Sequence, residues 1–214
     1  GDTFNLGWKL ASVLRGQCYP KLLHTYSVER HDVAKELIDF DRKFAGMFSV
    51  QPKGKMDPAG SSPEEFKQYF IKKGRFTAGT EVCYNPSIIT GKPIHQKLAT
   101  GFQIGRRFHS APVIRLADAK SVELGHVVKA DGRWRLFIFS NLSRLNNLCE
   151  FLISDPSSPL INYTPKGLDI DSSIDVRAVL PNGHRDIDIM DVPSLLRPSK
   201  GRYGLTDYEK VFCI

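Results

Sequence analysis

The stretch Asp131-Gly-Arg-Trp-Arg-Leu-Phe-Ile-Phe139 decides the fold class of this chain. Asp131-Gly132 is typical of a turn, and the residues that follow it, Trp134–Phe139, form a short and largely apolar run. The unbroken apolar stretch Leu136–Phe139 favours a strand that is covered on both faces. We therefore expect Trp134–Phe139 to be a central strand of a sheet.

A helix and further strands are predicted around this run. The spacing of Leu145, Leu148, Cys149 and Leu152 predicts a helix from about residue 142 to residue 153. Other short apolar runs predict strands at Val113–Leu116, Ser121–Leu124, Ile174–Leu180 and Tyr208–Ile214. We expect the strand at 208–214 to be unfinished and unpaired. Strand, helix and strand in this order predict an α/β layer.

The first 48 residues are predicted to be helical. The apolar residues of a first helix recur on one face, at Leu6, Leu10, Val13 and Leu14. Asp2 or Thr3 can cap the start of this helix, and Gly16 suits its end. Pro20 fits the first turn of a second helix, and Ser27 is a cap candidate for the long amphipathic stretch after it. The apolar face of that stretch consists of Val33, Ala34, Leu37, Ile38, Phe44, Ala45 and Phe48.

A loop separates these helices from the next one. Residues 50–62 are rich in proline, glycine and serine. Ser62-Pro63-Glu64-Glu65 is a capping box, with proline at the first helical position. It predicts a helix that ends near Gly74, and an irregular segment at 75–112 follows.

Composition excludes several classes of protein. The 214 residues carry 30 Lys and Arg against 23 Asp and Glu, a formal net charge of +7. No apolar run is long enough for a membrane span, so we expect neither a membrane protein nor a membrane partner. The tight basic clusters, Lys72-Lys73-Gly-Arg75 and Arg106-Arg107, suit solvated surfaces better than a nucleic-acid interface. The four cysteines are far apart and favour reduced thiols in the cytoplasm: Cys18, Cys83, Cys149 and Cys213.

No motif in the sequence predicts a self-contained active site. The six histidines have no metal-ligand spacing, and no P-loop, GxGxxG or GxSxG motif is present. Asp186, Asp188 and Asp191 could bind a cation, but a solvated loop is the favoured interpretation. Ser140 and Ser143 lie where a thioredoxin-type fold carries its redox cysteines, so disulfide exchange is excluded there. We assign no catalytic, cofactor-binding or metal-binding residue.

One segment carries a family resemblance. Gly1-Asp-Thr-Phe-Asn-Leu-Gly-Trp-Lys-Leu-Ala11, with Leu14-Arg-Gly16, resembles the helix that follows the last FAD-binding motif of flavin-dependent aromatic hydroxylases. The pattern of Leu23, Tyr26, Glu29, Arg30, Val33 and Ala34 is similar to the next helix of that family. Leu37–Ser49 narrows the resemblance to the phenol 2-monooxygenase branch. Three later stretches resemble its C-terminal thioredoxin-like domain: Arg107–Asp118, Asp131–Phe139 and His184–Asp191.

The resemblance implies a larger enzyme. Members of this family bind FAD, use NADPH and oxygen, and hydroxylate a phenolic substrate ortho to its hydroxyl group. By resemblance, Asp2 and Asn5 cap and pack a helix whose start faces the flavin, without contacting it. The family's own FAD motifs would lie upstream of Gly1, so we expect this chain alone to bind neither FAD nor NADPH.

The expected fold class is α/β, with the helical tail of an FAD-binding and substrate domain before an incomplete thioredoxin-like domain. The expected domains are C-terminal helices of the FAD-binding domain at 1–49, a linker and helical segment at 50–106, and a thioredoxin-like dimerisation domain at 107–214. On this hypothesis the chain is a C-terminal fragment that scaffolds a homodimer and packs on a missing N-terminal FAD-binding domain. The alternative is a stand-alone, thioredoxin-like protein-interaction module without catalytic activity.

Overall fold

The chain divides into two compact units. The computed structural model describes residues 1–49, 63–108 and 110–214. The first unit is Gly1–Arg107 and the second is Phe108–Ile214. No helix in these described ranges is long and apolar enough to span a bilayer.

Some sequence-based predictions fall on residues that the structure does not describe. The loop expected at 50–62, the cap residue Ser62, the side chain of Phe48 and His109 all lie outside the described residues.

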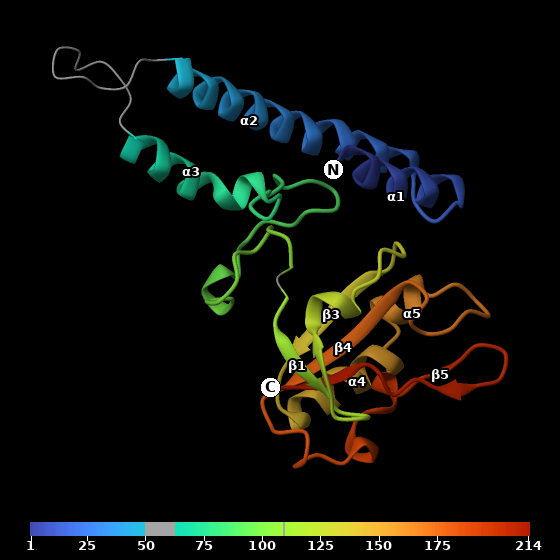
Figure 1. Cartoon of the computed structure of the whole chain (residues 1–214). Coiled ribbons are helices and arrows are strands. Elements are labelled where there is room, and N and C mark those ends of the chain that lie inside the picture. Colours follow the sequence, from blue (N-terminus) through green and yellow to red (C-terminus); the bar gives the residue numbers. More distant parts are fainter. Residues whose placement is uncertain (50–62, 109) are drawn as a thin grey trace. The chain divides into compact units, whose positions relative to one another are not determined.

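The first unit is built from helices and an irregular tail. Its elements are α1 (Asp2–Leu14), η1 (Pro20–Leu23), α2 (His24–Ser49), α3 (Pro63–Thr77) and η2 (Gln96–Leu98). In Figure 1, α2 and α3 run side by side. Aromatic side chains of the two helices contact each other. The ring of Phe40 on α2 lies 5.8 Å from that of Tyr69 on α3. The predicted helices are therefore confirmed, and α2 and α3 pack through stacked side chains.

Two of the predicted helix caps are wrong. Gly1 is the N-cap of α1, and no side chain caps this helix. Asp2 lies inside α1 and pairs instead with Arg30, at 2.5 Å between Oδ1 and Nε. Ser27 lies within α2, which begins at His24.

Prolines and glycines mark the helix ends better than polar caps do. Pro20 occupies the first turn of η1, as predicted. Gly16 follows α1 with a φ of +70°, a conformation that glycine adopts without strain. Helix α3 begins at Pro63 but continues past Gly74 to Thr77, since one glycine weakens a helix without ending it.

The second unit is a mixed sheet with helices. Its helices are η3 (Leu124–Val127), α4 (Leu142–Ser154), α5 (Pro159–Tyr163), η4 (Ile189–Asp191) and η5 (Ser194–Leu196). Its strands are β1 (Pro112–Arg115), β2 (Lys120–Glu123), β3 (Trp134–Phe139), β4 (Ile174–Leu180), β5 (Ser199–Lys200), β6 (Leu205–Thr206) and β7 (Val211–Cys213). Five strands form one sheet in the order β2-β1-β7-β4-β3, and β5 pairs with β6 in a separate hairpin. Strands β3, β4 and β7 are parallel, while β1 is antiparallel to both β2 and β7.

The predicted position of Trp134–Phe139 is wrong. This segment is a strand, as expected, but β3 is an edge strand, paired only with β4 among the described residues. Ile138 is buried, whereas Trp134 and Phe139 are 61% and 62% exposed. An apolar run indicates burial of side chains and does not state how many neighbours a strand has. The middle strand of the sheet is β7, and the largely buried β4 lies between β7 and β3.

The prediction for the end of the chain is also wrong. Val211–Cys213 forms β7, which lies between β1 and β4 and is fully buried. The strand is therefore paired on both edges. Its side chains contribute to both faces of the sheet: Val211 and Cys213 belong to one core cluster, and Phe212 belongs to the other.

Candidate functional site

A buried polar cluster joins the first two long helices. Lys9 of α1 is 0% exposed and places its Nζ 2.6 Å from Oε2 of Glu29 on α2. The same ammonium donates to Oδ1 of Asn5 at 2.8 Å, and Asn5 donates from Nδ2 to Glu29 at 2.6 Å. Asn5 and Lys9 lie one turn apart on α1, so both face Glu29. These three residues form what we call the α1–α2 cluster.

A second pair secures the start of α1. Arg30, next to Glu29 on α2, pairs with Asp2 and donates to the Tyr84 hydroxyl at 3.4 Å. Burial by itself lowers the pKa of Arg30, but its hydrogen bonds to Tyr84 and Asp2 outweigh burial and raise the pKa. Asp2 and Asn5, expected from the resemblance to pack this helix, are thus both bound to α2 by charged partners.

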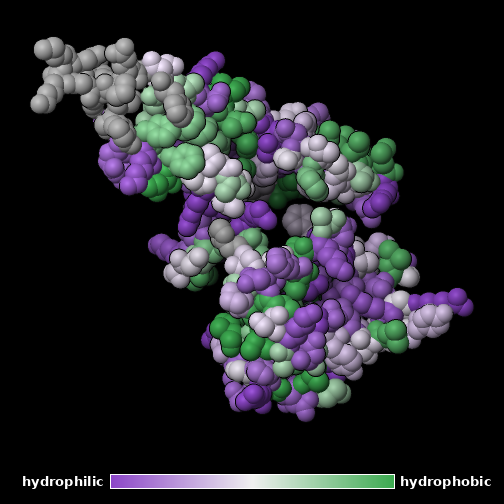
Figure 2. Space-filling view, in the orientation of Figure 1, coloured by the Kyte–Doolittle hydropathy of each residue, from purple (hydrophilic) through white to green (hydrophobic). Residues whose placement is uncertain are grey.

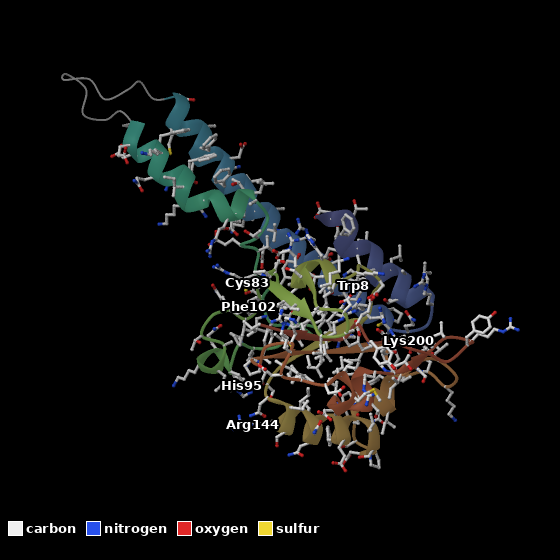
Figure 3. All side chains as sticks on the ribbon, turned by 60° about the horizontal axis from the view of Figure 1, so that its bottom comes forward. Trp8, Cys83, His95, Phe102, Arg144 and Lys200 are labelled. Carbon is white, nitrogen blue, oxygen red and sulfur yellow. The ribbon has the colours of Figure 1, made fainter. Side chains whose placement is uncertain are left out.

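The first unit has a small apolar core. Of its described residues, Leu22 and Phe76 are the buried hydrophobic ones, while Lys9, Thr25 and Glu29 are buried and polar. Many large apolar side chains of its helices are exposed: Phe4, Trp8, Leu10, Leu14, Val28, Leu37, Ile38, Phe70 and Ile71. Figure 2 shows green, hydrophobic atoms on the outside of these helices, and Figure 3 labels Trp8 on α1. The helices of this unit therefore expose the kind of surface that other elements usually cover.

A groove of the first unit is lined by charges of both signs. It lies between α2 and α3, is open to solvent and has a volume of about 490 Å³. It is lined by Asp32, Lys35, Glu36, Asp39, Phe40, Lys43, Tyr69 and Lys73. Binding pockets for small molecules are usually enclosed and mostly apolar, so this groove does not resemble one.

A buried charge network lies at the start of the parallel strands in the second unit. Lys210, immediately before β7, is buried and contacts two carboxylates. Its Nζ lies 2.6 Å from Oδ2 of Asp171 and also pairs with Oδ1 of Asp175, the second residue of β4. Two arginines also form ion pairs with Asp175. The Nε–Oδ2 distance is 2.9 Å for Arg177 of β4 and 3.2 Å for Arg135 of β3. One buried carboxylate therefore links three neighbouring parallel strands.

Lys200 extends this network to the β5–β6 hairpin. Its Nζ lies 2.5 Å from Asp171 and 2.7 Å from Asp207, and Figure 3 labels it on its strand. Burial by itself raises the pKa of Asp171, but hydrogen bonds from Lys200 and Lys210 outweigh it and hold the pKa below its usual range. Burial likewise raises the pKa of Asp175, and the hydrogen bond and charge of Lys210, with Arg177, reverse that shift. Arg133 pairs with Asp131 and Asp171, and Arg135 also pairs with Asp131. We use the name strand-start network for this set: Asp131, Arg133, Arg135, Asp171, Asp175, Arg177, Lys200, Asp207 and Lys210.

The sequence contained one signal for this network. Asp175 and Arg177 alternate with apolar residues in a strand that is otherwise apolar, and Lys210 directly precedes Val-Phe-Cys213. Charged residues next to buried strands need partners of opposite charge. The partners themselves could not be read from the sequence, because they lie up to 39 residues apart.

The carboxylates at 186–191 lie in a loop with local roles. Asp188 caps η4 by accepting a hydrogen bond from the Met190 amide at 2.8 Å. In the part of the chain that the structure describes, no group of three His, Cys, Asp or Glu side chains could hold a metal ion. The segment after β3 also has a structural role, because Asn141 caps α4 through the Arg144 amide. Asp188 and Asn141 therefore cap helices, and the two segments do not form one site.

The four cysteines, all of them free thiols, are expected to fall into two reactivity classes. Cys18 and Cys83 are exposed, whereas Cys149 and Cys213 are buried. Burial raises the pKa of Cys149 to about 11, and burial with the charge of Asp186 raises that of Cys213. Since the thiolate is the reactive form, a dithionitrobenzoate titration should detect Cys18 and Cys83 in the native chain and all four thiols in denaturant. Rapid reaction of all four in the native chain would contradict the buried placement.

Two family models match this chain. Residues 82–214 match the phenol hydroxylase C-terminal dimerisation domain, and residues 1–41 match an FAD-binding domain. The first match covers the whole of the second unit, and the second covers α1 and most of α2.

Three curated relatives align over nearly the whole chain. The 3-hydroxybenzoate 4-monooxygenase of Comamonas testosteroni is 54% identical over 99% of this chain and 34% of its own length. The FAD-dependent monooxygenase terD of Aspergillus terreus is 38% identical over 99% of the chain and 36% of its length. The phenol 2-monooxygenase fsqG of Aspergillus fumigatus is 30% identical over 95% of the chain and 33% of its length. The chain spans about a third of the length of these relatives.

Proposed function

Since the chain belongs to the phenol hydroxylase C-terminal dimerisation domain family, we propose that it is the dimerisation part of an FAD-dependent aromatic hydroxylase. The resemblance seen in the helix motif at Gly1–Ala11 is confirmed by this membership and by the FAD-binding domain match at 1–41. On this proposal the second unit holds two copies of the enzyme together, and the first unit completes its FAD-binding domain.

The observation that carries this proposal is the contrast between the two units. The second unit has two hydrophobic clusters, one on each face of its sheet, and its central strands are buried. The first unit buries few apolar residues and exposes those of α1 and α2. A self-standing domain and the helical end of a larger domain would differ in this way. We infer that the exposed apolar faces of α1 and α2 pack on the rest of an FAD-binding domain.

The same proposal includes the domain bounds, the type of fold and the roles of individual residues. The domains are the FAD-domain helices at 1–49, a linker and helical segment at 50–106, and a thioredoxin-like domain at 107–214. A parallel group of strands, a crossover helix and an antiparallel hairpin support the thioredoxin-like assignment. No residue of this chain is assigned to catalysis or to direct cofactor contact. The α1–α2 cluster would position α1, and FAD, reduced by NADPH, would supply the redox chemistry when bound.

The proposed substrate is a phenolic compound such as 3-hydroxybenzoate. This choice rests on the relative from Comamonas testosteroni, which is 54% identical and is named for hydroxylation of 3-hydroxybenzoate at carbon 4. That carbon is adjacent to the carbon that carries the hydroxyl group, which agrees with ortho hydroxylation. A stand-alone interaction module remains the second candidate, favoured by the self-contained core of the second unit.

A chimaera tests the proposal. We would replace the C-terminal third of the Comamonas testosteroni enzyme by this chain and assay NADPH oxidation that depends on 3-hydroxybenzoate. The proposal expects a dimeric, FAD-loaded chimaera with activity within about tenfold of the parent, a barrier change of about 1.4 kcal/mol or less. The isolated chain is the control, and it should leave FAD fluorescence unchanged. A folded chimaera without FAD or activity would favour the interaction module.

A further inference from the structure

The outer edge of β3 carries unpaired backbone groups. The Trp134 amide donates to Ser173 O and the Ser140 amide donates to Val179 O, so the even-numbered residues of β3 direct their amides toward β4. Because neighbouring residues of a strand direct their hydrogen-bonding groups to opposite edges, Arg135, Phe137 and Phe139 direct theirs outward. No strand of the described residues pairs with this edge.

The side chains at this edge are unusual for an exposed strand. Native proteins protect free edges with lysine, proline or a bulge. Strand β3 instead has Trp134 and Phe139 largely exposed and an apolar sequence between Leu136 and Phe139. An apolar edge of this kind is a template for pairing with another strand.

We propose that β3 pairs with β3 of a second copy of this chain in an antiparallel two-fold arrangement centred on Phe137. This inference rests on the proposed dimerisation function and names the surface that performs it. In this register Phe137 lies opposite Phe137 of the second copy, and Arg135 lies opposite Phe139 of the second copy. The six outward amide and carbonyl groups of each strand would all be paired, which would extend the sheet continuously across the dimer.

Charge and chain direction disfavour the centres at Arg135 and Phe139, the other two residues of β3 that direct their backbone groups outward. A pairing centred on Arg135 would place two guanidinium groups opposite each other, which is destabilising. A pairing centred on Phe139 would extend into Asn141, which has left the strand to cap α4. The centre at Phe137 instead places each Arg135, whose guanidinium is already paired with Asp131 and Asp175 of its own copy, beside an aromatic ring of the second copy.

The test introduces opposite charges at position 139, because Phe139 is 62% exposed and can be changed without disturbing the core. In the proposed register, Phe139→Glu places a carboxylate opposite Arg135 of the second copy, and Phe139→Arg places a second cation there. Two such contacts occur per dimer, but Asp131 and Asp175 already compensate much of the charge of Arg135, so we expect the dimer Kd of Phe139→Arg to exceed that of Phe139→Glu by about threefold. Sedimentation equilibrium over a range of concentrations measures both constants.

Tyr203 provides the matched control. It is 80% exposed between β5 and β6, outside the proposed surface. The pair Tyr203→Glu and Tyr203→Arg should have equal Kd values, close to that of the unchanged chain. Hydrogen exchange on the unchanged chain gives an independent measurement, because the amides of Arg135, Phe137 and Phe139 should gain protection as concentration rises.

The outcomes separate this inference from the proposed function. Equal dimer constants for the two Phe139 variants, or no gain in protection at the three amides of a dimeric chain, would overturn the β3 surface and leave dimerisation intact. An unchanged chain that stays monomeric at tens of micromolar would overturn the dimerisation function and the surface with it.

Discussion

Asp175→Asn is expected to lower the free energy of unfolding of the second unit by about 3–5 kcal/mol, the usual cost of breaking a buried ion pair. Asp175 is fully buried and faces Lys210, Arg177 and Arg135. Asparagine keeps the shape but removes the negative charge, so three cations lose their shared partner. Urea unfolding followed by Trp134 fluorescence in a Trp8→Phe background measures the change in this unit.

Two comparisons make this prediction specific to the network. Asp118→Asn removes an exposed carboxylate from its pair with Arg115 and should change the urea midpoint little. Lys210→Met combined with Asp175→Asn should cost less than the sum of the two single changes, because each removes the same contact. Additive single changes, or a midpoint unaffected by Asp175→Asn, would show that the network does not hold the strands together.

The same carboxylates predict how the stability of this unit depends on pH. The folded-state pKa values of Asp171, Asp175 and Asp207 lie below the ordinary value of 3.8 for this side chain. Groups of this kind contribute their stabilisation in full above the unfolded pKa, and it is lost as pH falls through the folded pKa. The free energy of unfolding should therefore decline below about pH 4, and less steeply in Asp175→Asn than in the unchanged chain.

The sequence predicted the longer elements of the second unit closely, but it did not predict α5, the short helices η3, η4 and η5, or the β5–β6 hairpin. Strand β4 has the predicted bounds, and α4 ends one residue beyond its prediction. These elements have strong periodicity and clear boundaries, which is the information that a local pattern contains. Trp134–Phe139 was predicted as a strand for the same reason, but its place in the sheet was wrong. Strand order depends on contacts between distant residues, and apolarity alone does not record them.

Local sequence patterns could not predict the partners of the buried charged residues, for a related reason. The charged partner of Lys9 is 20 residues away on another helix, and that of Asp171 is 39 residues away at Lys210. A sequence pattern shows that a charged residue lies beside apolar ones, but it does not identify the residue that pairs with it. The cap predictions at Asp2 and Ser27 failed because Asp2 pairs with Arg30 and α2 already begins at His24.

The α1–α2 cluster is expected to hold α1 on α2. Lys9→Met should destabilise the docking of α1 on α2 by about 3–5 kcal/mol, because it leaves Glu29 as a buried, uncompensated charge. Asn5 would remain as a donor to Glu29 Oε2, while Glu29 Oε1 already has no hydrogen-bond partner among the described residues. Trp8, whose ring centroid lies 5.7 Å from the Lys9 ammonium, reports on this contact by fluorescence in a Trp134→Phe background.

The matched control is the same substitution at Lys73, which pairs with Glu36 at 3.4 Å on a partly exposed surface of the same unit. Because exposed pairs contribute about 0–1 kcal/mol, Lys73→Met should leave the unfolding midpoint nearly unchanged. Glu29→Gln should resemble Lys9→Met, since it leaves the buried Lys9 ammonium without its counter-charge. If Lys9→Met and Lys73→Met were equally mild, α1 would be held by its apolar contacts alone, and the buried pair would have no part in positioning the helix.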